Sequence, residues 1–426
     1  MTLLFLLVGC RPSSIGLATD DSASPGGGDS GLENAPGTDT AVDDTAVPGD
    51  DPEADAAYQD GLFSSEVVHE IAITLDRDAE LALRDDPYEY TPGGVSIDGE
   101  DGGTVGVRLR GKIGSFRDLS GKPKFKIDFA QYDAGRRFHG LHALSLNNSV
   151  VDCGYLRDPL GYRIFRDAGV GTARTGFATV TVNGVNYGLY VTVEVADEQY
   201  LELAFPGDDE GQLYDGKYEY NENTGRYTLL DFGIGVDDRF QLEEGTENGN
   251  AEIVAVSEVV SGLRRGTNPE TELGALIDWE LVHREWAVEE LIGHLDGYIL
   301  NTNNYRVYFR PSDGKMVILP TDFDYAFQNA RNWGMNWTSP RGTLASACWY
   351  STECTANHAA ATSAVIASLD YDDILAWYDE IDALTLEIAK DDPRRECGSS
   401  QVASNRSSLR TWTVTAVDTA REHWGI

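Results

Sequence analysis

The stretch 294–309, HLDGYILNTNNYRVYF, carries an acid and a run of amides between an apolar approach and an alternating, strand-like end. Asp296 is followed five positions later by Asn301, and two further asparagines come close behind. A carboxylate can accept the proton of an attacking hydroxyl group, and carboxylate and amide oxygens are ligands that Mg²⁺ prefers. These residue types therefore match phosphoryl transfer, in which a metal-bound phosphate reacts with a hydroxyl.

A second acidic pair, Asp322 and Asp324 in TDFDYAF, follows a predicted β-hairpin over residues 305–320. The hairpin reverses the chain, so it can return Asp322 to the neighbourhood of Asp296 and Asn301. Protein kinases use the same order of parts: an Asp and an Asn separated by four residues, and then a metal-binding Asp. Taken alone, the spacing is equally typical of helix caps and Asx turns, so a purely structural role stays open.

The elements around these stretches are predicted to be mainly strands in the first half of the chain and helices in the second. Residues 177–195 give the clearest signal, two alternating strands around the turn Asn183-Gly184. Strands followed by helices predict an α+β fold. Further strands are expected at 68–75, 105–114, 124–132, 141–148 and 211–220, and helices at 76–87, 158–170, 198–205, 233–276, 276–295 and from about 359 onward.

Charge limits the possible partners. The chain of 426 residues has 71 acidic and 33 basic residues, a formal net charge of −38 at pH 7. This charge would repel a phosphate backbone, which argues against nucleic acid as a partner. A nucleotide is compatible with it, because Mg²⁺ can bridge carboxylates to phosphates. The length is sufficient for one large domain or two closely packed parts.

The amino-terminal segment predicts export. Residues 1–10, MTLLFLLVGC, resemble a bacterial lipoprotein signal in which Cys10 becomes the lipidated first residue after cleavage. The run is too short to span a bilayer as a helix, and a buried strand is the alternative. Residues 11–57 are acidic, rich in small residues and free of aromatics, so they should form a disordered tether. We therefore expect an exported protein, held to the cell envelope (outer membrane or cell surface) through the lipid at Cys10 alone.

Four further cysteines agree with export, since an even number favours disulfides in an exported protein. Cys348 and Cys354 are six positions apart and can close a small loop. Cys153 and Cys397 would then pair by elimination. A metal site is the alternative, but the sequence has no CxxC motif and no nearby pair of histidines to support it.

Several blocks of the chain, in the same order, resemble the CotH spore-coat kinase family, an atypical protein-kinase-like group. The resemblance covers about residues 67–328 and implies a two-lobed atypical protein-kinase-like fold over residues 58–426. The strand-rich lobe would run from about 58 to 230 and the helix-rich lobe from about 231 to 426. The blocks are VRLRGKIGSF, GKPKFKIDF, LSLNNSVVDCGYLRDPLGYRIFRDAGV, VTVNGVNYGLYVTVE, HLDGYILNTNNYRVYF and LPTDFDYAF.

The resemblance also implies roles for the acids and amides of the two polar stretches. Asp296 would be the catalytic acid–base residue. Asp322 would bind Mg²⁺, or Mn²⁺ in its place, and Asn301 would share a metal. Asp324 would support the ligands or replace one of them.

The same resemblance implies how the ATP phosphates are held. A loop from Arg108 to Ser115 would cover the nucleotide, because glycine lets backbone N–H groups approach phosphate closely. Lys122 or Lys126 would approach the phosphates, and the sequence does not distinguish between these two lysines. Glu194 would either pair with that lysine or end its strand in solvent. The implied nucleotide-binding residues are Arg108, Arg110, Gly111, Ser115, Lys122, Lys126 and Glu194.

The implied function is transfer of the ATP γ-phosphate to Ser or Thr hydroxyls of surface or exported proteins. The sequence departs from the family pattern at Asn303-Asn304, where an acid is expected, and at Lys112-Ile113, where small polar residues are expected. These departures keep open a non-catalytic pseudokinase, or a surface assembly module whose acids bind Ca²⁺ or no ion. Another phosphotransferase, such as one that moves a nucleotidyl group, is a further alternative.

Overall fold

The computed structural model describes residues 52–112, 114–216, 220–221, 226–227, 230–233, 235 and 239–426. The predicted signal at Cys10 and the tether up to residue 51 lie outside these ranges. Helix α1 (Pro52–Leu62) begins inside the segment predicted as tether, so the predicted boundary at residue 57 was wrong. The helix is ordered because Leu62 is buried in the core of the adjacent barrel, and because Arg174 binds Asp60 at 2.7 Å.

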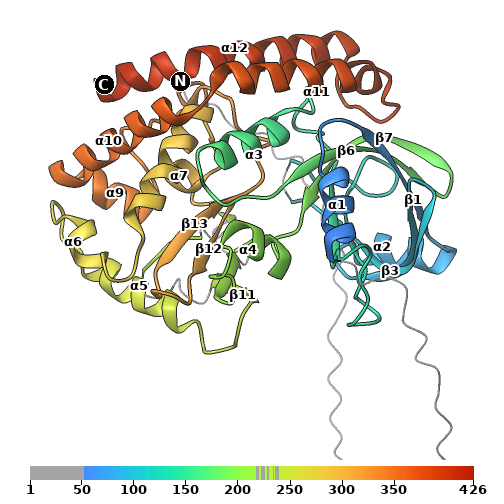
Figure 1. Cartoon of the computed structure of the whole chain (residues 1–426), viewed down its shortest axis with the longest axis horizontal. Coiled ribbons are helices and arrows are strands. Elements are labelled where there is room, and N and C mark those ends of the chain that lie inside the picture. Colours follow the sequence, from blue (N-terminus) through green and yellow to red (C-terminus); the bar gives the residue numbers. More distant parts are fainter. Residues whose placement is uncertain are drawn as a thin grey trace, which may run out of the picture. The chain divides into compact units, whose positions relative to one another are not determined.

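Seven strands form a closed barrel, in the order β1-β2-β3-β4-β5-β7-β6. All pairings are antiparallel except the one between β1 and β6, which is parallel and closes the barrel. Figure 1 shows these strands in blue to green. The bounds are β1 (Val68–Thr74), β2 (Thr91–Ile97), β3 (Glu100–Arg110), β4 (Lys124–Asp128), β5 (Ala143–Asn147), β6 (Thr175–Val182) and β7 (Val185–Glu194).

A second sheet has four strands, in the order β11-β8-β12-β13. Strand β8 pairs with β11 and β12, which both come after the predicted lobe boundary near residue 230. That boundary therefore divides the strands of one sheet, and β11 lies in a region predicted to be helical. The bounds are β8 (Gln212–Gly216), β11 (Phe240–Glu244), β12 (Tyr305–Phe309) and β13 (Met316–Pro320), and a separate pair is formed by β9 (Tyr220–Asn221) and β10 (Arg226–Tyr227).

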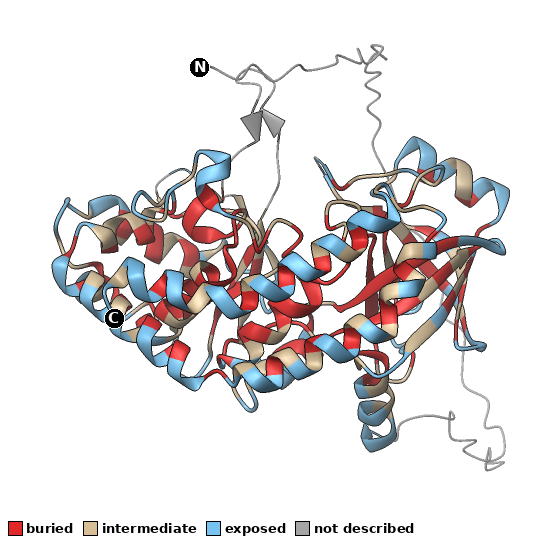
Figure 2. Cartoon of the chain, turned by 90° about the horizontal axis from the view of Figure 1, so that it is seen from above, coloured by how far each residue is buried: buried red, intermediate tan, exposed pale blue. Residues whose placement is uncertain are grey.

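The remaining helices lie mostly in the second half of the chain, as predicted. Long helices α11 and α12 run side by side in Figures 1 and 2. No helix within the described ranges has both the length and the apolar character needed to cross a membrane. The bounds are α2 (Arg77–Asp85), α3 (Arg157–Asp167), α4 (Glu198–Ala204), α5 (Ala251–Gly262), α6 (Pro269–Leu273), α7 (Trp279–Ile292), α8 (Tyr298–Asn301), η2 (Ala330–Trp333), α9 (Thr343–Trp349), α10 (Thr352–Ser368), α11 (Tyr371–Asp391) and α12 (Ser399–Trp424).

Two elements that the sequence predicts clearly are present in the structure, and one of them leads directly to the first polar stretch. The hairpin of β6 and β7 turns at Asn183-Gly184 with φ of +50° and +75°, the conformation that the Asn-Gly sequence predicts. Helix α7 begins at the capping side chain of Asp278 and ends at Gly293, which has a φ of +58°. In Figure 2, residues coloured as buried lie along the barrel strands and along the helices. Helix α7 therefore leads from the core directly to Asp296.

Candidate active site

The carboxylate of Asp296 is held by three asparagine side chains from the segment that follows it. The amide of Asn301 donates a hydrogen bond to Oδ1 of Asp296. The amides of Asn303 and Asn304 each donate to Oδ2 at 3.1 Å. The run of amides that the sequence places after this acid is therefore one hydrogen-bonding shell around a single carboxylate.

Burial raises the pKa of Asp296 to about 6. The asparagine amides favour the ionised form and limit this rise, whereas the negative charge of Asp322 adds to it. A carboxyl group with a pKa close to neutrality can both accept and release a proton at physiological pH. Asp296 thus has the protonation behaviour of a general base.

Lys124 is the basic residue that lies against the second acidic stretch. Its Nζ is 3.0 Å from Oδ2 of Asp322 and 3.4 Å from Oδ2 of Asp324, and its side chain is 5% exposed. Burial alone would lower the pKa of Lys124, but Asp322, Asp324 and Asp158 raise it above its ordinary value. The ammonium group therefore stays charged in the interior.

The pKa values of the two acids beside Lys124 shift in opposite directions. Burial favours the neutral form of Asp322, but the positive charges of Lys124 and Arg110 outweigh it and lower the pKa of Asp322. Burial and the charge of Asp322 raise the pKa of Asp324 well above its ordinary value. Oδ1 of Asp322 is buried and has no hydrogen-bond partner among the described residues. An ionised carboxylate with an unpartnered oxygen fits a divalent cation such as Mg²⁺.

Helix α3 positions the acidic stretch through buried contacts. Oδ1 of Asp158 accepts the backbone N–H of Phe323 at 2.7 Å, and the guanidinium of Arg157 donates to the carbonyl of Asp324 at 2.7 Å. The ring of Phe323 packs edge-on against Tyr162, 4.6 Å between centroids. A side chain at Gly161 would collide with that ring, because an added Cβ would lie 2.6 Å from it. The helix therefore sets where the acids point.

The two polar stretches form one site, as the predicted hairpin suggested. Strands β12 and β13 pair from Tyr305 with Pro320 onward, which returns the chain to its starting point. The amide of Asn304, which binds Asp296, also donates to the backbone carbonyl of Asp322 at 3.1 Å. A single side chain thus joins both stretches.

A cavity of about 340 Å³ opens over these acids. A smaller cavity of about 150 Å³ adjoins it and shares several lining residues with it, among them Arg108, Arg110, Arg306 and Asp322. Of the three shared arginines, Arg306 pairs with Asp215 at 3.0 Å, so Arg108 and Arg110 are the ones placed to meet an anionic ligand. The larger cavity is also lined by Gly111, Lys112, Ser115, Lys124, Asp215, Asp296, Asn303, Asn304, Asp324 and Tyr325.

The predicted phosphate-covering loop does border the cavity, and Arg108, Arg110, Gly111 and Ser115 all line it. The guanidinium of Arg110 donates to Oγ of Ser145 at 2.7 Å, which fixes it at the edge of the barrel. Gly111 has a φ of +101°, and an added Cβ would approach the backbone of Phe116 to 3.1 Å. A side chain at position 111 would therefore be disfavoured both by the backbone conformation and by the close approach of Phe116.

The lysine in contact with the acids is Lys124, which was not predicted. Of the two predicted lysines, Lys122 lies away from the acids, whereas the approach of Lys126 to phosphate stays a prediction. Lys122 precedes strand β4 and is buried elsewhere, with its Nζ 2.6 Å from Oδ2 of Asp392. Lys126 is two residues along β4, on the same face as Lys124, but it lines only the smaller cavity. Strand alternation could have grouped Lys124 with Lys126, but the sequence does not show where the strand meets Asp322.

Two further predicted residues have other partners. Glu194 does not pair with a lysine: its carboxylate binds the guanidinium of Arg174 at 2.6 Å and the backbone N–H of Arg174 at 2.9 Å. Asn301 donates to Asp296, and its carbonyl oxygen accepts a hydrogen bond from Arg341 at 2.9 Å. The side-chain oxygen of Asn301, the atom that would bind a metal, therefore already accepts one hydrogen bond and has one lone pair left.

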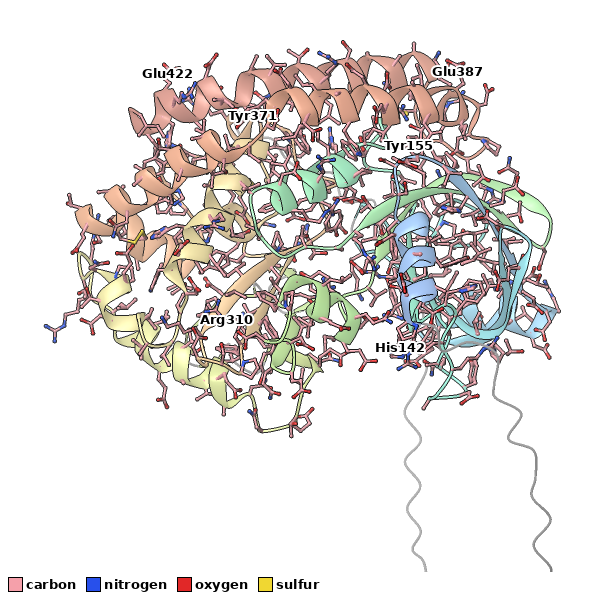
Figure 3. All side chains as sticks on the ribbon, in the orientation of Figure 1. His142, Tyr155, Arg310, Tyr371, Glu387 and Glu422 are labelled. Atoms are coloured by element: carbon pink, nitrogen blue, oxygen red, sulfur yellow. A yellow bond between two sulfur atoms is a disulfide. The ribbon has the colours of Figure 1, made fainter. Side chains whose placement is uncertain are left out.

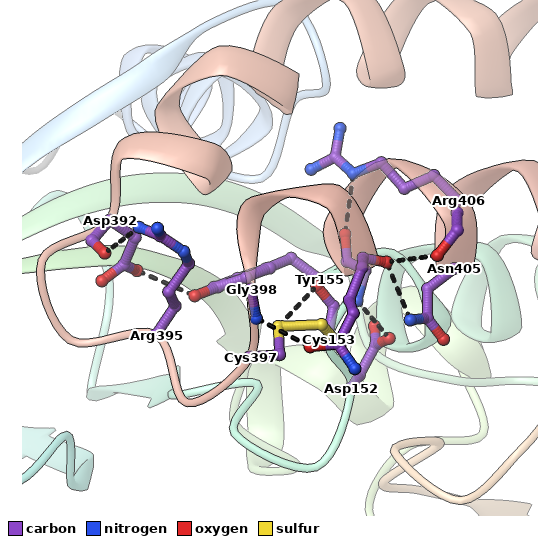
Figure 4. Close-up of a disulfide and its surroundings, with 12 residues drawn as sticks. Asp152, Cys153, Tyr155, Asp392, Arg395, Cys397, Gly398, Asn405 and Arg406 are labelled. Carbon is purple, nitrogen blue, oxygen red and sulfur yellow. Dashed lines mark hydrogen bonds between the residues drawn. A yellow bond between two sulfur atoms is a disulfide. The ribbon is translucent and has the colours of Figure 1, made fainter.

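Both predicted disulfides are present, Cys153–Cys397 and Cys348–Cys354. Figure 4 shows Cys153–Cys397 beside Asp392 and Tyr155. The hydroxyl of Tyr155 donates to Oδ2 of Asp392 at 3.0 Å. The number and spacing of the cysteines therefore predicted both pairings.

Comparison with known proteins gives the following matches. The family described as "CotH kinase protein" matches residues 107–363. "Inner spore coat protein H" of Bacillus subtilis (strain 168) is 24% identical over 225 residues, which cover 52% of this chain and 58% of that relative. The chain thus spans less than two thirds of that relative's length.

Two solved structures are similar at low identity. The Helicobacter pylori proinflammatory kinase CtkA has a TM-score of 0.32 and 8% identity, covering 74% of this chain and 96% of that one. HipA from the Shewanella oneidensis MR-1 toxin–antitoxin system, in its complex with HipB and operator DNA, has a TM-score of 0.30 and 14% identity, covering 84% of this chain and 74% of that one.

Proposed function

The chain belongs to the CotH kinase family, and on that premise we propose that it is an ATP-dependent protein kinase. It would transfer the γ-phosphate of ATP to Ser or Thr hydroxyls of surface or exported proteins. We further propose a two-lobed kinase-like arrangement and export to the cell envelope through a lipid at Cys10.

The observation that carries the proposal is the convergence of Asp296 and the Asp322–Lys124 ion pair on one cavity. Phosphoryl transfer requires little covalent work from a protein and depends on positioning and charge neutralisation. The cavity brings together a carboxyl group with a pKa of about 6, an ionised carboxylate with an unpartnered oxygen, and a lysine. These are the groups that this chemistry needs.

Each residue then has a defined task. Asp296 accepts the proton of the attacking hydroxyl, and its three amides keep it oriented. Lys124, Arg108 and Arg110 supply positive charge beside the phosphates. Asp322 would hold Mg²⁺, with Asp324 in support, and the bound ion would neutralise charge on the transferring phosphate.

The alternative is a non-catalytic surface module, favoured by the asparagines at 303 and 304 where an acid was expected. Both of these side chains bind Asp296, so they have a structural use that needs no nucleotide. Metal-dependent nucleotide binding distinguishes the two functions, because only a kinase requires the metal to bind ATP.

Calorimetric titration of the full chain with ATP, with and without Mg²⁺, tests the proposal. We expect binding only with Mg²⁺ and its loss in Asp322→Ala. The matched control is Asp379→Ala, which removes an exposed acid that pairs with Arg410 on helix α12. Equal binding with and without Mg²⁺, or no binding under either condition, would favour the surface module.

A further inference from the structure

A buried cluster of metal-ligand side chains lies outside the candidate active site. Cys348 lies in the last turn of helix α9, Cys354 lies in the first turn of α10, and His283 belongs to α7. One ring nitrogen of His283 and the two Sγ atoms all lie within 4.8 Å of one another, and all three residues are buried. The two sulfur atoms are joined as a disulfide in this structure.

The histidines of this region have ring nitrogens without partners. Nε2 of His283 lies 2.6 Å from Oε1 of Glu270, whereas its Nδ1 is buried and has no hydrogen-bond partner among the described residues. His358, one helical turn after Cys354, is 0% exposed, and neither of its nitrogens has a partner there. The nearest carboxylate oxygen that faces it, Oε2 of Glu290, is 3.6 Å from Nε2, beyond hydrogen-bonding distance.

These unpartnered atoms indicate a ligand. A buried polar nitrogen is normally hydrogen-bonded, because water can no longer solvate it. The contact with Glu270 fixes Nε2 of His283 as the donor, which leaves a lone pair on Nδ1. The rings of His283 and His358 lie 5.3 Å apart, and His358 lies outside the group of ligand atoms within 4.8 Å of one another, so its ring would have to turn to reach the same metal.

We propose that His283, Cys348 and Cys354 bind Zn²⁺ when the two cysteines are reduced, with His358 as the fourth ligand. Two cysteines and two histidines are a usual set for structural zinc. Glu270 would orient His283 from behind, as carboxylates do at zinc sites, and Trp286 and Trp349 beside His358 would exclude water. The site is independent of the proposed kinase function.

The disulfide and the zinc site are then two states of one cluster. A dithiol reductant supplies two electrons and two protons, which break the S–S bond and give two thiols, while the reductant becomes a disulfide. Zinc binding releases those two protons, because cysteine coordinates as the thiolate. Zinc itself is neither oxidised nor reduced. The sequence hid this site because His283 lies 65 positions before Cys348.

The test titrates Co²⁺ and then Zn²⁺ into the full chain, before and after reduction with a phosphine. We expect thiolate-to-cobalt absorption and one tightly bound zinc per chain after reduction only. His283→Gln should weaken zinc binding by about tenfold or more. His142→Gln should not; His142, labelled in Figure 3, is a partly exposed histidine near the barrel.

Alkylation followed by mass spectrometry tests whether Cys348 and Cys354 bind zinc, even if His283→Gln fails to fold. In the reduced, unaltered chain, zinc should protect Cys348 and Cys354, while Cys153 and Cys397 in the same molecule react. Equal reaction of all four cysteines in the presence of zinc would overturn the proposal. Full zinc affinity in folded His283→Gln would do the same.

Discussion

Nζ of Lys124 lies 3.0 Å from Oδ2 of Asp322, although the two residues are 198 positions apart in the chain. Lys124 belongs to the barrel, and Asp322 follows the last strand of the other sheet. Both side chains line the larger cavity together with Asp296. This ion pair is therefore the link between the barrel and the acids on which the proposed phosphoryl transfer depends.

Replacing Lys124 with Met should reduce phosphoryl transfer by about 10²–10³-fold, the usual effect of removing one preorganised electrostatic contact. The ammonium group compensates the charge of Asp322 and lies where phosphate charge would be held. The measurement is a transfer rate under single-turnover conditions, together with ATP affinity. A variant with the unaltered rate would show that this lysine has no part in the chemistry.

Replacing Lys122 with Met should have the opposite pattern, with lower stability and unchanged chemistry. Lys122 and Asp392 are 1% and 0% exposed, and removal of one partner leaves the other charge buried. We expect a loss of about 3–5 kcal/mol in the free energy of unfolding. Denaturant titration measures this loss. ATP affinity per folded molecule should stay the same, and a drop in affinity without a drop in stability would contradict the assignment.

Local patterns predicted much of the fold. The Asn183-Gly184 hairpin, helix α7 and the hairpin of β12 and β13 follow from periodicity and turn residues within short segments. Barrel closure did not follow, because the parallel pairing of β1 with β6 joins residues more than 100 positions apart. The pairing of β8 with β12 was not predicted either, because these strands are also far apart in the sequence.

The sequence predicted three acids of the candidate site and the loop from Arg108 to Ser115 that borders it, but not the lysine that contacts the acids. Asp296, Asp322 and Asp324 lie within recognisable stretches, and the structure brings them to one cavity. Lys124 was missed because three lysines alternate within five positions, and only the tertiary fold shows which one faces the acids. Asp158 was missed because its contact with Phe323 spans 165 positions.

Two buried glutamates of helix α7, Glu285 and Glu289, should make the stability of the protein depend on pH. Glu285 is 0% exposed, and burial raises its pKa well above its ordinary value, helped by the charge of Glu289 and a side-chain hydrogen bond with it. Burial also raises the pKa of Glu289 to about 7. The folded state therefore holds protons that the unfolded state releases. The associated stability is complete below the unfolded pKa and is lost as pH rises through about 7.

Denaturant unfolding at about pH 5.5 and about pH 8.5 checks this behaviour. The unaltered chain should lose about 1–3 kcal/mol at the higher pH, the cost of an unsatisfied buried group. Glu285→Gln should lose less. Glu280→Gln, at an exposed position of the same helix, should behave like the unaltered chain. Identical pH dependence in Glu285→Gln would mean that another group titrates.

The most direct test of the proposed kinase activity is the intact mass of the full chain after incubation with Mg-ATP, beside the variant Asp296→Asn. Asparagine keeps the shape of the side chain but cannot accept the proton of a hydroxyl. We predict that the unaltered chain gains the mass of one or more phosphate groups and that the variant gains none. A gain of a nucleotidyl group would contradict γ-phosphate transfer. No gain in either chain, together with no rise in melting temperature in the presence of Mg-ATP, would contradict the kinase assignment.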